Sequence, residues 1–170
     1  MVKSKTKVNY GSAWTATAVM RVMIGFVFLW AFLDKTMGLG FATKPGAAWL
    51  DGVSPTTGFL KFGVNAQSPF VDFFHGLAGN VLVDWLFMLG LLGIGMALIL
   101  GIGLRVAAAA GTALLVMMWA AEFPLKNNPI VDEHLVYAAA LWVVALSPRK
   151  FSLVSQWLQT PTVKKNPWLW

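Results

Sequence analysis

The sequence predicts an all-α membrane protein, a four-transmembrane-helix bundle with a long outer loop that contains short interfacial helices. Of its 170 residues, 58% are hydrophobic and only 12% are charged, whereas soluble domains carry roughly 25% charged residues. Nine tryptophans point the same way, because indole rings favour membrane interfaces. We therefore expect residues 1–170 to form a single integral membrane domain that contacts lipid.

Four apolar runs supply the predicted spans, since about 20 residues cross the hydrocarbon core of a bilayer. The second run contains Gly90, Gly93 and Gly95, and small residues at such spacings let neighbouring helices approach closely in lipid. The four predicted spans cover residues 14–33, 81–100, 106–121 and 130–146.

The connector between the first two spans, residues 36–80, is rich in glycine, proline and aromatic residues. Loops of this length without structure of their own are uncommon. Ser54-Pro55 and Ser68-Pro69 each offer an N-cap serine followed by proline at the first helical position. Asp72 falls in the first turn of the second start, where the helix dipole favours it. We expect short interfacial helices that cover one end of the bundle.

The charges predict the orientation of the chain. With four spans, the cytoplasmic tails are residues 1–12 and 147–170, and no cleavable signal pattern is found at the start. Eight lysines and arginines fall on the side of the termini, whereas the other side has four lysines and every acid of the chain. The positive-inside rule then places both termini in the cytoplasm and the connector outside. The net charge of +6 thus reflects topology, and no nucleic-acid partner is expected.

Ionisable groups are densest just before the fourth span. Asp132, Glu133 and His134 stand one turn before Tyr137, and Glu122 ends the preceding span, so these side chains are expected to meet at the outer mouth. Imidazole titrates near neutral pH and can exchange protons with a substrate. We predict that His134, with Glu133 and Asp132, forms a catalytic group. The alternative is that both acids only cap the fourth helix and complement its dipole.

Two cations, three tryptophans, Tyr137 and Glu122 are candidate groups for binding a substrate or a quinone. Arg21 lies about two turns inside the first span, and Lys35 follows that span. Arg21 either extends to the near interface or faces the bundle, where it and Lys35 hold oxygen atoms of an anion or a quinone. The tryptophans form an aromatic belt or, in the sharper interpretation, line a quinone pocket. The residues of that pocket would be Trp30, Trp85 and Trp119.

Several cofactor classes do not fit the sequence. The chain has no cysteine, which excludes a dithiol relay, a thiolate metal site and covalent haem attachment. His134 lacks a second histidine at helical spacing and a Glu-x-x-His motif. The other histidine, His75, lies in the connector. Neither metal nor haem is therefore expected.

Two motifs resemble the DoxX/DoxD family. One is Gly-Ile-Gly-Leu-Arg-Val-Ala-Ala from Gly101, preceded in the first span by Arg21-x-x-x-Gly25. The other, Asn128-Pro129-x-x-Asp132-Glu133-His134-x-x-Tyr137, resembles the DoxD branch, which includes the small membrane subunit of thiosulfate:quinone oxidoreductase. The resemblance covers roughly residues 19–146. Leu89 and Gly90 stand where many DoxX members have a glutamate.

The resemblance implies a four-helix bundle in a prokaryotic cytoplasmic membrane. It also implies a membrane subunit of a quinone-linked oxidoreductase that takes electrons from thiosulfate, with quinone as substrate and a second oxidoreductase subunit or larger membrane complex as partner. Two other functions fit the same sequence. One is a non-catalytic scaffold or regulatory subunit of a larger complex, and the other is a small transporter.

Overall fold

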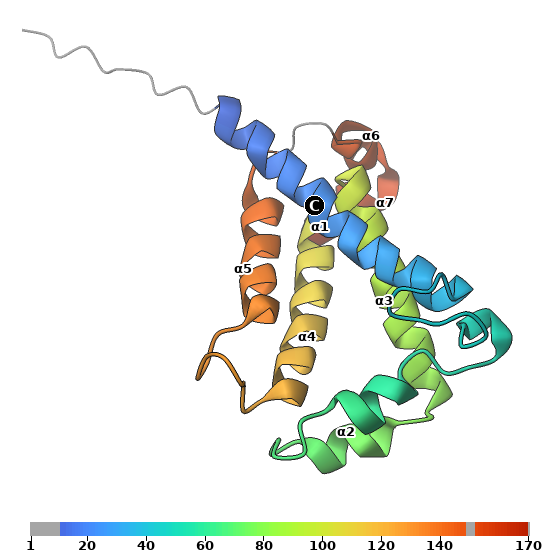
Figure 1. Cartoon of the computed structure of the whole chain (residues 1–170). Helices are drawn as coiled ribbons and strands as arrows, with labels where there is room; N and C mark the ends of the chain where they lie inside the picture. Colours follow the sequence, from blue (N-terminus) through green and yellow to red (C-terminus); the bar gives the residue numbers. More distant parts are fainter. Residues whose placement is uncertain (1–10, 149–151, 170) are drawn as a thin grey trace, which may run out of the picture.

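The computed structural model of the chain describes residues 11–148 and 152–169. Every regular element in these residues is helical. The predicted tail residues Lys3, Lys5, Lys7, Arg149 and Lys150 lie outside the described residues. The elements are α1 (Gly11–Met37), η1 (Trp49–Asp51), η2 (Phe59–Gly63), α2 (Val71–Leu77), α3 (Val81–Leu100), α4 (Leu104–Glu122), α5 (Glu133–Leu146), α6 (Val154–Gln159), α7 (Pro161–Lys165) and η3 (Pro167–Leu169), shown in Figure 1.

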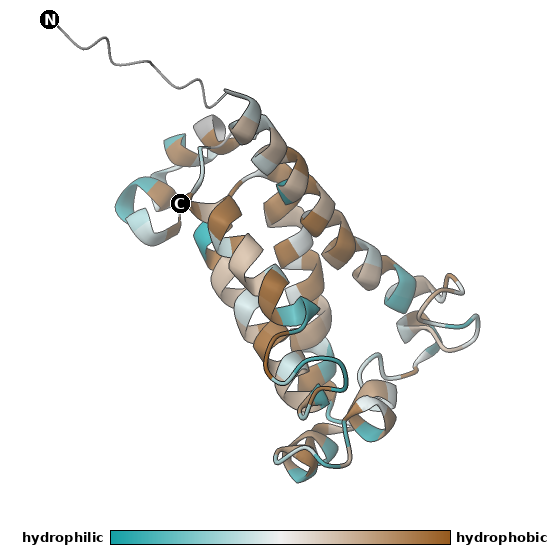
Figure 2. Cartoon of the chain, turned by 60° about the vertical axis from the view of Figure 1, so that its left-hand side comes forward, coloured by the Kyte–Doolittle hydropathy of each residue, from teal (hydrophilic) through white to brown (hydrophobic). Residues whose placement is uncertain are grey.

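Three of these helices, α1, α3 and α4, are long and apolar enough to cross a membrane. Only about a third of the most apolar window of each is buried inside the protein, and hydrophobic residues predominate along the ribbon of the bundle (Figure 2). The fourth apolar helix, α5, has 14 residues and is therefore about 21 Å long, against about 30 Å of hydrocarbon. The all-helical class is thus confirmed, with three helices that are candidate membrane spans, and α3 has the bounds predicted for the second span.

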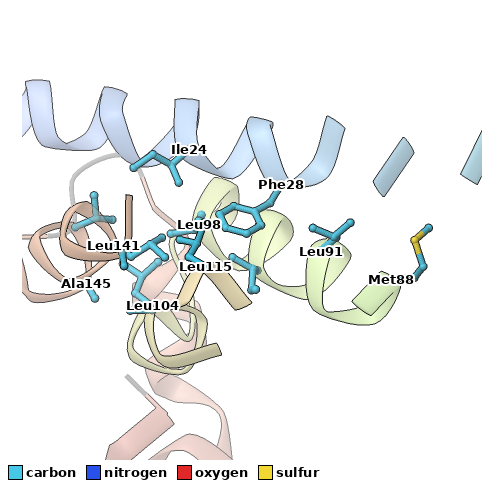
Figure 3. Close-up of a cluster of buried hydrophobic side chains, with 13 residues drawn as sticks. Ile24, Phe28, Met88, Leu91, Leu98, Leu104, Leu115, Leu141 and Ala145 are labelled. Atoms are coloured by element: carbon cyan, nitrogen blue, oxygen red, sulfur yellow. The ribbon is translucent and has the colours of Figure 1, made fainter. Parts of the chain in front are cut away.

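One buried apolar cluster joins α1, α3, α4 and α5 (Figure 3). Met88, Leu98 and Leu141 are among its fully buried members. Because lipid tails are as apolar as these side chains, close packing rather than exclusion of water stabilises such helix contacts in a membrane. The other labelled members of the cluster are Ile24, Phe28, Leu91, Leu104, Leu115 and Ala145.

The contact between α1 and α3 depends on two glycines. A Cβ atom on Gly95 would lie 2.8 Å from the backbone nitrogen of Leu29, and one on Gly25 would lie 2.9 Å from the Cβ atom of Leu98. Both distances are shorter than real Cβ contacts, so the two backbones touch at this crossing. Gly93 has nothing within 4 Å of such a Cβ atom, and Gly90 meets only the tip of Leu114 at 3.9 Å. Of the three glycines predicted to permit close approach, Gly95 is the one that α1 touches.

We predict that Gly95→Ala destabilises the bundle by about 1–3 kcal/mol, the usual cost of an overpacked interior, because the backbone of α1 must move away. Gly93→Ala is the matched control, since its methyl group enters open space and alanine favours helix. Thermal unfolding in detergent micelles, followed by circular dichroism, should give a clearly lower midpoint for Gly95→Ala alone. Equal midpoints for the two variants would contradict the close contact.

Residues 38–56 of the connector are attached to the bundle by two buried carboxylates. Asp34, near the end of α1, accepts hydrogen bonds from the backbone N–H groups of Phe41 and Thr43 at 3.3 and 2.8 Å. Asp84, in the first turn of α3, accepts from the hydroxyls of Ser54 and Thr56 at 2.8 and 2.5 Å. Each charge therefore has several donors, as a buried carboxylate requires.

The rest of the connector packs under the end of α4. The backbone N–H of Asn65 donates to the carbonyl of Ala121, and the Ser68 hydroxyl donates to the carbonyl of Ala120. A second apolar cluster packs at this contact. Its buried members are Leu60, Val64, Phe74 and Ala121. Short helices are present here as predicted, and the Ser54 hydroxyl accepts from the Thr57 N–H. Helix α2 begins at Val71, two residues after the predicted proline.

The described ends of the chain lie at the same end of the bundle. Helices α6 and α7 pack near the start of α1, whereas α2 and the connector lie at the opposite end (Figures 1 and 2). The tail is attached through the backbone N–H of Leu153, which donates to the carbonyl of Leu100 at 2.9 Å. We call the α2 end the outer end, and the predicted site residues of α5 are found there.

Candidate functional site

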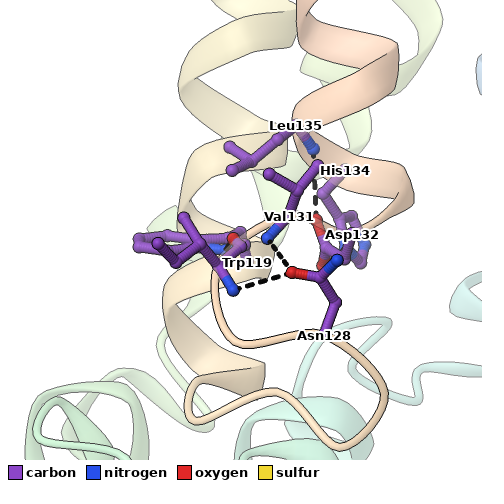
Figure 4. Close-up of polar contacts among 7 residues, drawn as sticks. Trp119, Asn128, Val131, Asp132, His134 and Leu135 are labelled. Atoms are coloured by element: carbon purple, nitrogen blue, oxygen red, sulfur yellow. Dashed lines mark hydrogen bonds and ion pairs between the residues drawn. The ribbon is translucent and has the colours of Figure 1, made fainter.

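The candidate site is centred on the first turn of α5. One carboxylate oxygen of Asp132, the N-cap residue, accepts a hydrogen bond from the backbone N–H of Leu135 at 3.2 Å. Its other oxygen lies 2.8 Å from Nδ1 of His134 (Figure 4). Asp132 therefore caps the helix and orients the imidazole at the same time, so the two interpretations of the sequence are not exclusive. Each of the two side chains is 10% exposed.

The pKa of the Asp132 carboxyl lies below its ordinary value of 3.8. Burial acts to raise it, but the hydrogen bonds from His134 and Leu135 and the charge of the imidazole together outweigh that effect. A carboxylate that accepts several hydrogen bonds is stabilised in its charged form. Asp132 is therefore ionised at neutral pH and provides an acceptor for His134 Nδ1.

The loop before α5 is held in place by two side chains. Oδ1 of Asn128 accepts from the backbone N–H groups of Ile130 and Val131, both at 2.9 Å. The indole N–H of Trp119, on α4, donates to the carbonyl of Ile130 at 2.9 Å. This network (Figure 4) fixes the chain that leads into Asp132. Trp119 thus serves to position the loop.

Two cavities adjoin the His134–Asp132 pair. The first, which we call the outer vestibule, has a volume of about 650 Å³ and lies between the connector and the loop before α5. Three carboxylates line it, Glu122, Asp132 and Glu133, together with one basic side chain, Lys126. Its other polar lining consists of the amide side chains of Asn65, Asn127 and Asn128. The vestibule is therefore polar and carries an excess of negative charge.

The second, which we call the bundle cavity, has a volume of about 230 Å³ and is lined by all four core helices. Its polar lining is limited to Lys35, Glu133, His134 and Tyr137. Val27 and Tyr137 are 52% and 42% exposed, so the cavity reaches the surface of the bundle. Its apolar lining consists of Ile24, Val27, Phe28, Ala31, Phe87, Leu91, Leu114, Leu115 and Met118.

Lys35 is one of the few polar groups in this apolar surface. Its Nζ atom lies 5.9 Å from the centre of the Phe87 ring, within the range of a cation–π contact. The cavity therefore brings together three of the predicted binding or catalytic residues, Lys35, His134 and Tyr137. Lys35 belongs to α1, the first core helix of the chain, and the other two belong to α5, the last. Glu133 lines both cavities and is itself exposed.

Arg21 lies far from this site. It precedes Lys35 by 14 positions in α1, which corresponds to about 21 Å along the helix, so the two cations cannot hold one small ligand. Arg21 is 2% exposed, and a Cβ atom on Gly101 would collide with its guanidinium and with Ser152. The guanidinium therefore lies against the C-terminal end of α3, where the helix dipole favours a cation. Arg21 faces inward at the end opposite to the vestibule.

The three tryptophans of the proposed quinone pocket do not meet. Trp30 packs edge-on against Phe41, with the ring centres 5.1 Å apart, and Trp85 packs edge-on against Trp49 at 4.7 Å. Trp119 is engaged with the loop, and none of the three lines either of the two cavities.

Glu122, on α4, is the predicted residue from another helix that lies beside Asp132 and His134. It ends α4, and ligand atoms of Glu122, Asp132 and His134 lie within 4.8 Å of one another. Such a set of two carboxylates and one imidazole can hold a divalent cation. The proton-handling role predicted for His134, Asp132 and Glu133 stays a prediction.

Sequence reasoning did not find the apolar wall of the bundle cavity. Phe28, Leu91 and Met118 read only as core residues, because apolar periodicity does not distinguish a filled interior from a cavity. The role of Asn128 had a sequence signal, since asparagine before proline commonly accepts hydrogen bonds from the backbone that follows it.

Comparison with known protein families, with curated proteins and with solved structures finds no match to this chain.

We predict that Asp132→Ala lowers the free energy of unfolding by about 1 kcal/mol, the usual value of an N-cap. Asp132→Asn is the control that retains capping.

Because the pKa of Asp132 is lowered in the folded protein, its charge stabilises the fold above pH 3.8. This contribution is lost as the pH falls through the pKa that Asp132 has in the folded protein. Thermal unfolding in micelles with a chelator, at pH 7 and pH 3, measures both effects. Identical midpoints for Asp132→Ala and the parent would exclude the capping role.

Proposed function

We propose that this chain is the quinone-binding membrane subunit of a quinone-linked oxidoreductase. The observation that carries the proposal is the bundle cavity, an apolar space at the surface of the bundle with Lys35, His134 and Tyr137 on its wall. Pockets of this kind, apolar with a few convergent polar groups, are typical ligand sites. A quinone has a flat apolar ring with two carbonyl oxygens, which suits these hydrogen-bond donors, and an apolar tail that suits lipid.

The resemblance of the sequence to the DoxX/DoxD family supports the same function. The charges of the outer vestibule indicate which of the two substrates this chain would bind. The outer vestibule has three carboxylates against one lysine, and such a field repels a small anion such as thiosulfate. We therefore propose that this chain supplies the quinone site, whereas a partner subunit receives electrons from the anionic reductant.

Two electrons and two protons convert the quinone to a quinol. Lys35 and Tyr137 would donate hydrogen bonds to the quinone oxygens and stabilise the negative charge that develops there during reduction. The partner subunit would provide the electrons, and the two protons would come from the aqueous side by way of His134 and the carboxylates beside it. In this arrangement the apolar wall of the bundle cavity would orient the quinone ring and keep it at the depth in the bilayer at which a lipid-soluble quinone lies.

The quinone site is tested by filling the cavity from its rim. Val27→Trp places an indole in the bundle cavity, and Val22→Trp is the matched control, because Val22 is exposed on the same helix but does not line the cavity. We expect Val27→Trp to weaken binding of a short-chain ubiquinone analogue at least tenfold in micelles, with Val22→Trp unchanged. Titration calorimetry measures the affinity.

Lys35→Met and Tyr137→Phe should each weaken the same analogue severalfold, because each removes one donor and leaves the apolar wall. Absence of binding to the parent chain, or equal binding to all four variants, would overturn the quinone site. Binding without thiosulfate-dependent quinone reduction by the chain in its native membrane would favour the non-catalytic scaffold over the oxidoreductase.

We further propose that α5 is a fourth span and that both termini are cytoplasmic. Ala138, Leu141, Val144 and Ala145 place α5 in the same apolar core as the three long helices. The described ends of the chain lie at one end of the bundle (Figure 1), and an even number of spans is required for that arrangement. Basic residues at this end include Arg105, Lys164 and Lys165, which the positive-inside rule assigns to the cytoplasm.

The topology predicts the behaviour of reporters in a bacterial host. A reporter that is active only in the cytoplasm should work when fused after Trp170, whereas alkaline phosphatase, which needs an oxidising compartment, should work only when inserted in the connector near Gly46. Gly46 is suitable because it lies in an exposed turn. Phosphatase activity from the fusion after Trp170 would contradict the proposed orientation.

A further inference from the structure

We propose that Glu122, Asp132 and His134 form a binding site for a divalent transition-metal cation, with Zn²⁺ the best match. One ligand atom from each residue lies within 4.8 Å of the others. Ligands of a zinc ion stand about 2.0–2.2 Å from it, so two ligands of one ion are at most about 4.4 Å apart. The three side chains thus need only a small rotation of a carboxylate to share one cation.

The site is assembled by the fold and not by local sequence. Glu122 is the last residue of α4, whereas Asp132 and His134 begin α5. The intervening loop is fixed at both ends: the Asn65 side chain donates to the carbonyls of Glu122 and Pro124, and Asn128 holds the residues before Asp132. Ligands that the scaffold already holds in place lose little freedom on binding. This property distinguishes the cluster from acids gathered on a mobile surface.

The donor types match a borderline cation. Imidazole suits zinc and its neighbours, carboxylates accept most divalent ions, and a site of mixed nitrogen and oxygen donors binds zinc more tightly than manganese or iron. His134 is buried, at 8% exposure, and its Nδ1 atom lies 2.8 Å from the Asp132 carboxylate. Two adjacent ligands of one ion are roughly 3 Å apart, so a cation can take the place of the proton that these two groups share.

The volume and the charge of the outer vestibule also suit a divalent cation. Glu122 and Asp132 line the outer vestibule, whose volume of about 650 Å³ leaves room for water ligands and a path from the aqueous side. Within residues 11–148 and 152–169, neither Glu122 nor Glu133 has an ion-pair partner. The excess of carboxylates over the single Lys126 concentrates cations at this opening.

A cation here would link the end of α4 to the start of α5. It would also lie beside the bundle cavity, because His134 and Glu133 line that cavity as well. The metal site nevertheless stands apart from the proposed function, since it rests on three side chains at the vestibule and would exist whether or not a quinone occupies the bundle cavity.

The test is a zinc titration of the full chain in micelles after removal of metal with a chelator. We expect one equivalent of Zn²⁺ by calorimetry. Co²⁺ should show the visible absorption bands of a site with protein ligands. Zinc should also raise the midpoint of thermal unfolding, because it binds only the folded chain.

Two pairs of variants make the test specific. Glu122→Gln removes a ligand from a partly exposed position, and Asp72→Asn makes the same change of charge on exposed α2. His134→Gln removes the imidazole, and His75→Gln removes the exposed connector histidine. We expect at least a tenfold loss of zinc affinity, and loss of the zinc-dependent rise in the midpoint, for the first member of each pair only.

Circular dichroism without metal shows whether each variant is folded. Should His134→Gln fail to fold, Glu122→Gln with Asp72→Asn decides the question alone. No zinc binding by the parent chain, or equal affinity in Glu122→Gln and Asp72→Asn, would overturn the site.

Discussion

Buried carboxylates that accept hydrogen bonds organise the outer end of this protein. Asp34 holds the first part of the connector through two backbone N–H groups, Asp84 holds the next part through two hydroxyls, and Asp132 caps α5. A charge at the edge of a membrane domain is costly unless donors surround it, so each acid fixes the segment that satisfies it. Glu122 and Glu133 have no such structural duty among the described residues, and this leaves them available to a ligand.

How much the sequence reveals differs between the helices and the site. Apolar runs and their end signals predict the long helices, since a bilayer requires long apolar segments whose backbone bonds are internal. The connector helices η2 and α2 lie close to Ser54 and Ser68, but their N-cap residues are Gly58 and Phe70. The sequence predicts only that Glu122 and His134 could meet, because the two residues are separated by a short turn. Whether they do meet depends on the path of that loop, which contacts of Asn128 and Trp119 determine in the folded protein. The separation of Arg21 from Lys35 follows directly from their spacing on one helix. The bundle cavity has no sequence signature at all.

The vestibule and the bundle cavity meet at the first turn of α5. Asp132 and Glu122 line the vestibule, His134 lines the cavity, and Glu133 lines both. One helical turn therefore separates a polar, negatively charged space of about 650 Å³ from an apolar space of about 230 Å³. The proposed cation and the proposed quinone would thus lie on either side of this turn, and neither needs the other to bind.

In the topology proposed above, α5 is a fourth span that is shorter than its neighbours, so the surrounding lipid would have to adapt to it. At 14 residues it falls about 9 Å short of the hydrocarbon thickness of an average bilayer. Hydrophobic mismatch of this size is relieved by thinning the bilayer or drawing polar headgroups inward. Headgroups would then descend on the α5 side, near Tyr137. A dimple in the outer leaflet would bring the membrane surface down to the bundle cavity, so a molecule dissolved in the leaflet would reach it by lateral diffusion alone.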